Sequence, residues 1–314
     1  MPAYKFKTCI IDGQEQYAVS PVDCKDHPPE TRSIQFPESQ LSFVDIEMHT
    51  IAPLISDISD GIRCLSDEQR STDIDKILHA LDALADHHIY FEVFRQEWAD
   101  RIAQSQSAGP LQKRWQQGTR HMVEDLVGIQ CQIKYLFSQV LDIDGEGGPV
   151  PEKMISYART DSSFQFRPQA THYEIWNDAA FAEVLYPESM YDLISYHIQE
   201  CVKRELRFRI CKNCGRYFCI TGRRTAVYCH RSFGRKGGTC NGVGPVSAWT
   251  QKSHEDEVLM SYRREYKRRF AWINAGKISK DDFYGWSKLA REKKKECDSG
   301  TISREAFAEW LRQS

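Results

Sequence analysis

Five cysteines lie within thirty residues of this 314-residue chain, and they constrain its fold more than any other feature. The other six of its eleven cysteines are scattered. An odd number of cysteines with one tight cluster is typical of a metal site in a reducing compartment, and not of a disulfide framework. We therefore expect a metal-binding module in a cytoplasmic protein. The clustered residues are Cys211, Cys214, Cys219, Cys229 and Cys240.

The spacing of the first pair, Cys-x2-Cys, puts two thiols on one tight turn. Gly215 follows directly and allows the left-handed backbone that such a turn requires. Two more ligands would complete a tetrahedral site, and Cys229 with Cys240 is the natural second pair. The spacing then reads Cys-x2-Cys-x14-Cys-x10-Cys and predicts a structural Zn²⁺ ion. The predicted ligands are Cys211, Cys214, Cys229 and Cys240.

The second pair needs a route back to the first. The segments YFCIT and TAVY alternate like two strands around TGRR, so a hairpin would carry Cys229 back. The fourth ligand stays open, because Cys219 and His230 are close enough in sequence to replace Cys240. A redox Cys-x2-Cys pair is the rival interpretation, but such pairs usually open a helix in a βαβ setting, which this stretch lacks.

The cysteine-rich stretch is also strongly basic. Residues 203–240 contain eleven lysines or arginines and one acid, whereas the net charge of the whole chain is −2. Arginines on exposed turns of a rigid module can bind phosphates. We predict contacts with nucleic acid, DNA in preference to RNA; the alternative is that the basic surface docks on the protein's own acidic remainder. The predicted contacts are Arg223, Arg224, Arg231, Arg235, Lys236, Arg263, Arg264, Lys267 and Arg268.

The rest of the chain predicts a mostly helical α+β protein. Residues 1–60 read as short strands and loops, and residues 67–142 as three helices broken near His87 and at residues 108–110. Residues 142–152 read as a linker, THYEIW as a strand, and residues 187–206 as a helix. The predicted parts are a strand-rich segment 1–60, a helical body 61–202, a treble-clef-like or ribbon-like zinc module 203–247, and a C-terminal helical array 248–314.

The C-terminal array contains an internal repeat of 24 residues. Gly276 to Trp286 is matched by Gly300 to Trp310. In each copy we expect the glycine to close one helix and a serine, Ser279 or Ser303, to cap the next. Isoleucine and phenylalanine then sit at the positions of a hydrophobic staple. The two tryptophans are expected to pack in the shared seam.

The string CKNCGRYF, the later RR and YC pairs and the basic segment YRREYKRR carry a resemblance. They resemble the CGNR-type zinc fingers of bacterial proteins and, more closely, an uncharacterised bacterial family of unknown function. The resemblance covers roughly residues 190–314 and implies zinc at the four predicted ligands. Two features depart from the CGNR pattern: ten residues separate the last two cysteines, and Asn241-Gly242 replaces Asn-Arg.

Enzymatic motifs are missing from the sequence. There is no phosphate-binding glycine loop, nucleophile elbow or dinucleotide fingerprint. Two groups of possible ligands, His87 and His88 with Glu92 and His121 with Asp125, lack a hydrolytic zinc motif. No apolar run approaches the roughly 18 residues that span a bilayer. We expect a regulatory nucleic-acid-binding protein with zinc as scaffold, neither an enzyme nor membrane-bound. The alternative is an interaction module whose zinc finger clamps a protein partner or a homo-oligomer.

Overall fold

The computed structural model describes residues 6–19, 30–64, 70–108, 119–145, 148–160, 163–177, 179–234 and 237–314. The chain forms two compact units. The first comprises Met1–Ile210 with Gly215–Val227, and the second comprises Cys211–Cys214 with Tyr228–Ser314. The four-part division expected from the sequence stays a prediction, and the boundary between the two units runs within the expected zinc module 203–247. The protein is a mostly helical α+β protein, as predicted.

The first unit contains a five-stranded antiparallel sheet in the order β3-β2-β1-β5-β4. The tight β1–β2 turn uses Asp12 and Gly13, both with positive φ, as a two-residue hairpin turn requires. Because Thr8 pairs with Leu185, the N-terminal strands join strands from the middle of the chain and do not stand alone. The strands are β1 (Phe6–Ile11), β2 (Gln14–Val19), β3 (Glu30–Gln35), β4 (Thr171–Trp176) and β5 (Ala180–Leu185).

The expectation that residues 1–60 contain only strands and loops was wrong. Two helices, α1 (Glu38–Val44) and α2 (Met48–Cys64), follow β3. Helix α2 contains four isoleucines that recur every three or four residues, and all four are fully buried. This spacing puts them on one face of a helix, and burial of that face favours a helix over a strand. The isoleucines are Ile51, Ile55, Ile58 and Ile62.

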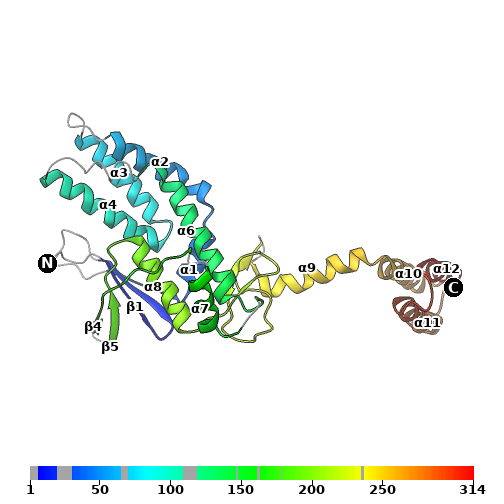
Figure 1. The fold of residues 1–314 in the computed structure, drawn as a ribbon. Helices are drawn as coiled ribbons and strands as arrows, with labels where there is room; N and C mark the ends of the chain where they lie inside the picture. Colours follow the sequence, from blue (N-terminus) through cyan, green and yellow to red (C-terminus); the bar gives the residue numbers. More distant parts are fainter. Residues whose placement is uncertain are drawn as a thin grey trace. The chain divides into compact units, whose positions relative to one another are not determined.

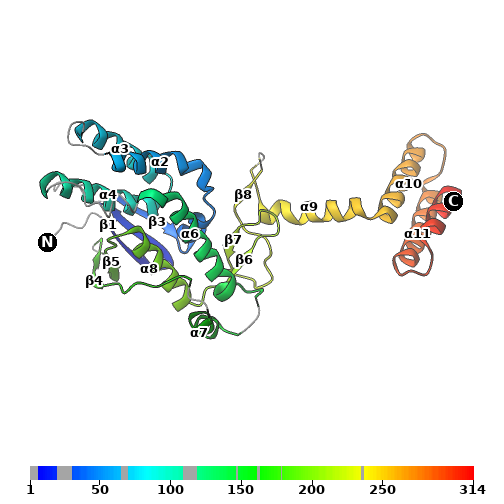
Figure 2. The same cartoon turned by 45° about the horizontal axis from the view of Figure 1, so that its top comes forward.

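The three helices expected between residues 67 and 142 are confirmed, with the first break at residues 86–88. At the second expected break, residues 108–110, a helix ends at Ala108, and residues 109–110 lie outside the described part of the chain. In Figures 1 and 2, α2, α3 and α4 run side by side. Gly61 permits a close approach of α2 to α3, since a Cβ there would lie 2.6 Å from Cγ1 of Ile77. These elements are α3 (Arg70–Ala85), α4 (Ile89–Ala108), the 3-10 turn η1 (Thr119–His121), α6 (Met122–Leu136) and the π turn η2 (Phe137–Leu141).

Two more helices complete this unit. The helix expected over residues 187–206 is α8 (Met190–Lys203), which begins with a capping box between Ser189 and Asp192. The predicted linker at 142–152 is too long by three residues, because α7 (Val150–Thr160) already begins within it. No helix in the described ranges combines the length and the apolar character needed to cross a membrane.

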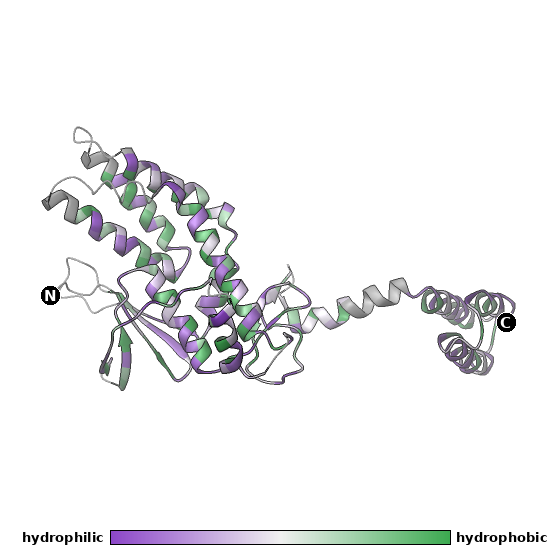
Figure 3. Ribbon diagram, in the orientation of Figure 1, coloured by the Kyte–Doolittle hydropathy of each residue, from purple (hydrophilic) through white to green (hydrophobic). Residues whose placement is uncertain are grey.

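The sheet separates two layers of apolar side chains. Phe6 and Tyr17 lie in the large core with the helices, whose apolar stripes Figure 3 shows in green. Cys9 and Ala18 point to the opposite face and form a smaller cluster with Trp176. This alternation follows from the two-residue period of a strand and places Glu15, on the same face as Tyr17, in the large core.

The cysteine-rich stretch does not form the hairpin expected from YFCIT and TAVY. Strand β7 (Tyr217–Cys219) pairs instead with the preceding strand β6 (Phe208–Ile210). Both strands belong to the first unit, where Phe208 is fully buried in the large core. The burial of Phe208 explains the pairing, because it anchors β6, which directly precedes the cysteines in the sequence, to the large core.

The second unit contains a short hairpin and four helices: β8 (Ser232–Phe233), β9 (Gly238–Thr239), α9 (Cys240–Glu255), α10 (Glu257–Asn274), α11 (Lys280–Asp298) and α12 (Arg304–Gln313). The predicted repeat is confirmed. Ser279 and Ser303 cap α11 and α12 with the same backbone angles, φ −76° and ψ 162°. Gly276 and Gly300 precede them with positive φ. Phe283 and Phe307, the staple phenylalanines, are both buried.

Candidate metal centre

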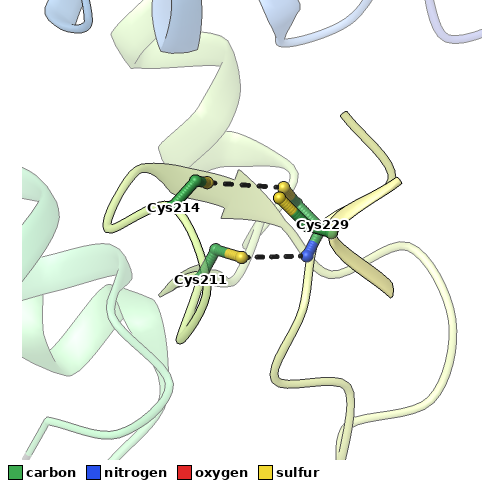
Figure 4. A group of neighbouring side chains, drawn as sticks. Cys211, Cys214 and Cys229 are labelled. Carbon is green, nitrogen blue, oxygen red and sulfur yellow. Dashed lines mark hydrogen bonds between the residues drawn. The ribbon is translucent and has the colours of Figure 1, made fainter. Parts of the chain in front are cut away.

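Four of the five clustered cysteines come together in the second unit. The Sγ atoms of Cys211, Cys214, Cys229 and Cys240 all lie within 4.8 Å of one another. Three of the four side chains are buried, Cys214 is half-buried, and none forms a disulfide. Figure 4 shows the sulfur of Cys214 facing that of Cys229. The quartet is the one predicted from the spacing.

Local structure explains how the quartet forms. The first pair lies in the chain between β6 and β7, where Gly215 adopts the expected positive φ of 72°. The second pair is joined by the β8–β9 hairpin, and the amide of Cys240 donates to the carbonyl of Arg231 across 3.0 Å. Cys240 is also the first residue of α9. A turn, a hairpin and the start of a helix thus supply the four cysteines.

The quartet fits a tetrahedral metal ion. With metal–sulfur bonds of about 2.3 Å, neighbouring sulfurs of a tetrahedron lie about 3.8 Å apart. The two sulfur atoms of Cys214 and Cys229 are 3.7 Å apart, far more than the length of about 2.05 Å in a disulfide. Four sulfur ligands in this geometry suit Zn²⁺ or iron. The site can therefore hold a metal ion.

Hydrogen bonds support the thiolates that a metal requires. The backbone amide of Cys229 donates to Sγ of Cys211, and the side-chain amide of Asn213 donates to Sγ of Cys240, both across 3.3 Å. Burial alone would raise the pKa of Cys211. Hydrogen bonds from the backbone amides of Cys229, Cys214 and Asn213 outweigh burial and lower this pKa to about 7. The pKa of Cys229 is raised by burial and by its cysteine neighbours. The hydrogen bonds therefore stabilise the thiolate of Cys211. Four neighbouring thiolates would repel one another, so a cation is needed to hold all four together.

The two alternative fourth ligands are not part of the cluster. Cys219 lies in β7 and packs against the core of the first unit, where burial raises its pKa to about 11. His230 is exposed. Cys219 follows Phe218 along a strand, so its side chain points to the other face, and it behaves as a small apolar residue.

The structure describes seven of the nine predicted nucleic-acid contacts, which differ in exposure and in pairing. Arg223, Arg224, Arg264 and Lys267 are exposed, while Arg231 and Arg263 are half-buried. Arg268 is exposed but forms an ion pair with Glu265 at 2.6 Å, so its charge is already partly neutralised. Arg235 and Lys236 lie outside the described residues.

Sequence reasoning missed the residue that holds the loop of Arg223 and Arg224. The guanidinium of Arg209 donates to the carbonyls of Arg224 and Ala226, at 2.9 and 2.6 Å. The same group forms a two-pronged ion pair with Asp144, at 2.6 and 2.7 Å. Its place between Phe208 and Ile210 in a strand gives no hint of this role, because the partners lie 15 to 65 residues away.

A second missed feature is a buried polar network in the core of the first unit. The hydroxyl of Tyr17 donates to the carboxylate of Glu15. The hydroxyl of Tyr90 lies 2.8 Å from Nδ1 of His197. Ser39 joins the two halves, 3.2 Å from the oxygen of Tyr17 and 3.4 Å from His197. Burial raises the pKa of Glu15 to about 7 and lowers that of His197 to about 3. Its members are too far apart in sequence to form a motif.

His88, set aside as a metal ligand in the sequence, belongs to this polar network. Its Nε2 lies 3.0 Å from the carbonyl of Ser39 and 3.1 Å from the hydroxyl of Ser42. Burial lowers the pKa of His88 to about 4. The ring is therefore neutral at pH 7 and fixes α1 against the start of α4.

An open hollow of about 510 Å³ lies between α4, α6 and the start of α8. It gathers titratable side chains, which an enzyme would need. Its two arginines are already held by acids: Arg101 pairs with Glu97 at 2.5 Å and Arg167 with Asp192 at 3.6 Å. Ser189 and Asp192 also line it, and the hydroxyl of Ser189 donates to the carboxylate of Asp192 at 2.8 Å, a pair that forms the capping box of α8.

The C-terminal half of the chain has relatives. Residues 158–314 match the model of a protein family, DUF6076, described as a family of unknown function. The matched part begins before β4 and includes all four clustered cysteines and the C-terminal helices. No curated protein matches the chain. No solved structure matches it either.

Proposed function

The chain belongs to DUF6076, a family of unknown function, and we propose from its own residues that it is a regulatory nucleic-acid-binding protein built around a structural zinc ion. The proposal assigns zinc as a scaffold and basic residues as phosphate contacts. It assigns no catalytic residue. Free cysteines in such number suit the cytoplasm, where we place the protein.

The four-cysteine cluster supports zinc. A site closed by four protein ligands has no open position for a substrate, which is typical of structural zinc. Bound zinc supplies two positive charges that stabilise four thiolates. Asn213 and the amide of Cys229 would then hold the sulfur atoms in place, as outer hydrogen bonds do in zinc sites.

One observation carries the nucleic-acid part of the proposal. Arg223 and Arg224 are exposed on a loop whose backbone is fixed by Arg209. A second bond, from the amide of Ala226 to the carbonyl of Arg223 at 2.9 Å, closes the turn. A fixed backbone lowers the entropy lost when a ligand binds. Exposed guanidinium groups on such a turn suit phosphate.

The pattern of ion pairs favours a free basic surface over an internal clamp. A clamp would pair these cations with acids of the body. Within the described residues of the first unit, to which Arg223 and Arg224 belong, neither arginine forms an ion pair, and Arg268 of the second unit pairs with Glu265 of its own helix. Cations left without acids are available to an external polyanion.

Salt-dependent binding tests the proposal. The zinc-loaded full chain is titrated with labelled duplex DNA, single-stranded DNA and RNA across a series of salt concentrations. We expect affinity to fall with salt, because phosphate contacts release counterions. The double variant Arg223→Ala/Arg224→Ala is expected to flatten the slope of log K against log salt by about 1 to 2.

Arg120→Ala/Arg159→Ala is the matched control, since both arginines are exposed and the change in charge is the same. It should leave the slope as in the wild type. Absence of binding to every probe at low salt would refute the proposal. Equal effects of the two double variants would show attraction by overall charge and not by the loop.

Assembly is the second candidate function, and one observation favours it. Tyr173, Ile175 and Phe181 form an exposed apolar patch on the β4–β5 hairpin, and Tyr173 stacks on Phe181. In the described sheet β4 is an edge strand. Exposed apolar edges promote pairing with another chain. Sedimentation of the wild type against Phe181→Ser tests whether this patch joins two copies.

A further inference from the structure

A cationic groove lies between α10 and α11 of the second unit, with a volume of about 510 Å³. Helix α10 contributes Tyr262, Arg263, Tyr266 and Lys267. Helix α11 contributes Tyr284, Ser287 and Arg291. Three cations and three tyrosines thus line one groove, and no acid is among its lining residues. Sequence reasoning identified the two cations of α10 but none of the α11 residues.

The walls of the groove are held by the core of the C-terminal helices. Tyr262 stacks on Trp286, with ring centroids 6.4 Å apart and an angle of 11° between the planes. Tyr266 meets the ring of Phe283 edge-on at 5.0 Å. Both partners are buried. The groove is therefore formed before any ligand binds, which lowers the entropy lost on binding.

Tyr284 differs from the other two tyrosines, because 63% of it is exposed. One edge of its ring meets Phe283 at 5.7 Å between centroids, and the larger part of the side chain stays open beside the cations. Its flat face can stack on a nucleobase, which every base allows irrespective of sequence. In a duplex the bases already stack on one another, so a side chain in this groove cannot reach them without unstacking.

The cations of the groove can face phosphates. Lys267 is exposed, and Arg291 is fixed by a bond from its Nε to the carbonyl of Ser287 at 3.2 Å. The buried acid of α10, Glu265, is occupied by Arg268 and Arg269. Glu265 does not line the groove and so does not compete with a ligand for Lys267 or Arg291.

We propose that the groove between α10 and α11 binds single-stranded nucleic acid, with Lys267 and Arg291 on phosphates and Tyr284 stacked on a base. This rests on the proposed function, and it names the form of nucleic acid that the protein prefers. The volume lies in the range of sites for small ligands, so one nucleotide at a time occupies the groove while the strand continues past it.

The test uses the zinc-loaded full chain and fluorescence anisotropy with labelled oligonucleotides of about 20 nucleotides: single-stranded DNA, single-stranded RNA and duplex DNA. We expect both single strands to bind at least about tenfold tighter than the duplex at about 0.1 M salt. Tyr284→Ala should weaken binding of single strands by roughly five- to 150-fold. It should leave the salt slope and duplex affinity unchanged.

Two variants separate stacking from charge. Tyr284→Phe keeps the ring and should bind as the wild type does. Lys267→Ala/Arg291→Ala should reduce the salt slope for single strands by about 1.4, since each phosphate contact contributes about 0.7. Controls are Tyr135→Ala, which removes an exposed tyrosine of the first unit, and Arg304→Ala/Arg312→Ala, which removes two exposed cations of α12. Neither control should change these quantities.

The outcomes separate this inference from the proposed function. Binding without a preference for single strands, or a Tyr284→Ala variant with wild-type affinity, overturns the groove and leaves phosphate contacts by Arg223 and Arg224 intact. Absence of binding to all three probes overturns both. Equal losses in Tyr284→Ala and Tyr284→Phe would show that the hydroxyl and not stacking matters, which also overturns the inference.

Discussion

The side-chain amide of Asn213 donates a hydrogen bond to Sγ of Cys240 across 3.3 Å, although the two residues are 27 positions apart. The bond joins the turn of the first cysteine pair to the start of α9. A donor aimed at sulfur stabilises the thiolate and fixes its direction. Asn213 thus acts through Cys240 and would not touch the metal itself.

Replacing Asn213 by alanine should weaken metal binding by about 10- to 100-fold, the usual cost of losing an outer hydrogen bond in a zinc site. Competition with a chromophoric chelator measures this. Asn241→Ala is the matched control, since the side chain of Asn241 is exposed. If the two variants hold metal equally well, the bond to Cys240 has no role in binding.

Cys240→Ser should release the metal to a competing chelator, whereas Cys219→Ser should keep one zinc ion per chain. The reason is that Cys219 packs against the core of the first unit and lies outside the cluster. Elemental analysis of the purified variants gives the stoichiometry and the identity of the metal. Zinc loss in Cys219→Ser with retention in Cys240→Ser would reverse the assignment.

Arg209→Ala should lower nucleic-acid affinity roughly tenfold, because the loop of Arg223 and Arg224 loses its anchor and must be ordered on binding. Arg209→Lys is the control for charge. It keeps the cation but cannot reach Asp144 and two carbonyls at once, so it should show most of the same loss. Wild-type affinity in Arg209→Lys would show that only the charge counts.

Glu15 should make stability depend on pH. Its pKa in the folded protein, about 7, is raised by burial above the ordinary value of 4.5. The folded state therefore holds a proton that the unfolded state has lost, and this contribution to stability is present below pH 4.5 and disappears as the pH rises to 7. Glu15→Gln removes the effect. Between pH 4 and pH 8 the free energy of unfolding of Glu15→Gln should rise by roughly 3 kcal/mol relative to that of the wild type.

Urea unfolding at several pH values measures this difference in the free energy of unfolding. Glu124→Gln is the control, because Glu124 is exposed, and its difference from the wild type should not change with pH. His88 and His197 act in the opposite sense. Burial lowers their pKa to about 4 and 3, so their contribution is present above pH 6.5 and is lost on acidification. A flat difference for Glu15→Gln would mean that Glu15 is ionised in the folded state.

The two capping serines should differ in their effect on the C-terminal helices. Ser279→Ala removes a bond from the amide of Asp282 and one to its carboxylate. Ser303→Ala removes a bond from the amide of Ala306 and a bond to the fully exposed carboxylate of Glu305, which contributes less because water screens it. Each should cost about 1 kcal/mol, with the larger loss at Ser279. Hydrogen exchange of the α11 and α12 amides measures the losses, and Ser279→Asp, which retains an acceptor, should restore protection.

Local signals in the sequence determined much of the second unit. The caps, staples and positive-φ glycines of the repeat act between residues at most a few positions apart, so they can be read directly from the chain. The spacing of the cysteines likewise identified four candidate ligands, because a metal site requires a fixed set of donors.

Tertiary structure alone decided the pairings between distant residues. The sheet joins Thr8 to Leu185, β7 turns back to β6 because Phe208 is buried, and Arg209 finds its acid at Asp144. The sequence left Cys219, His230 and Cys240 as alternatives for the fourth ligand. Only the tertiary structure separated them, because it packs Cys219 on the core and brings Cys240 into the cluster. Such choices depend on the apolar surface that the whole unit can bury, a quantity that no short stretch of sequence contains.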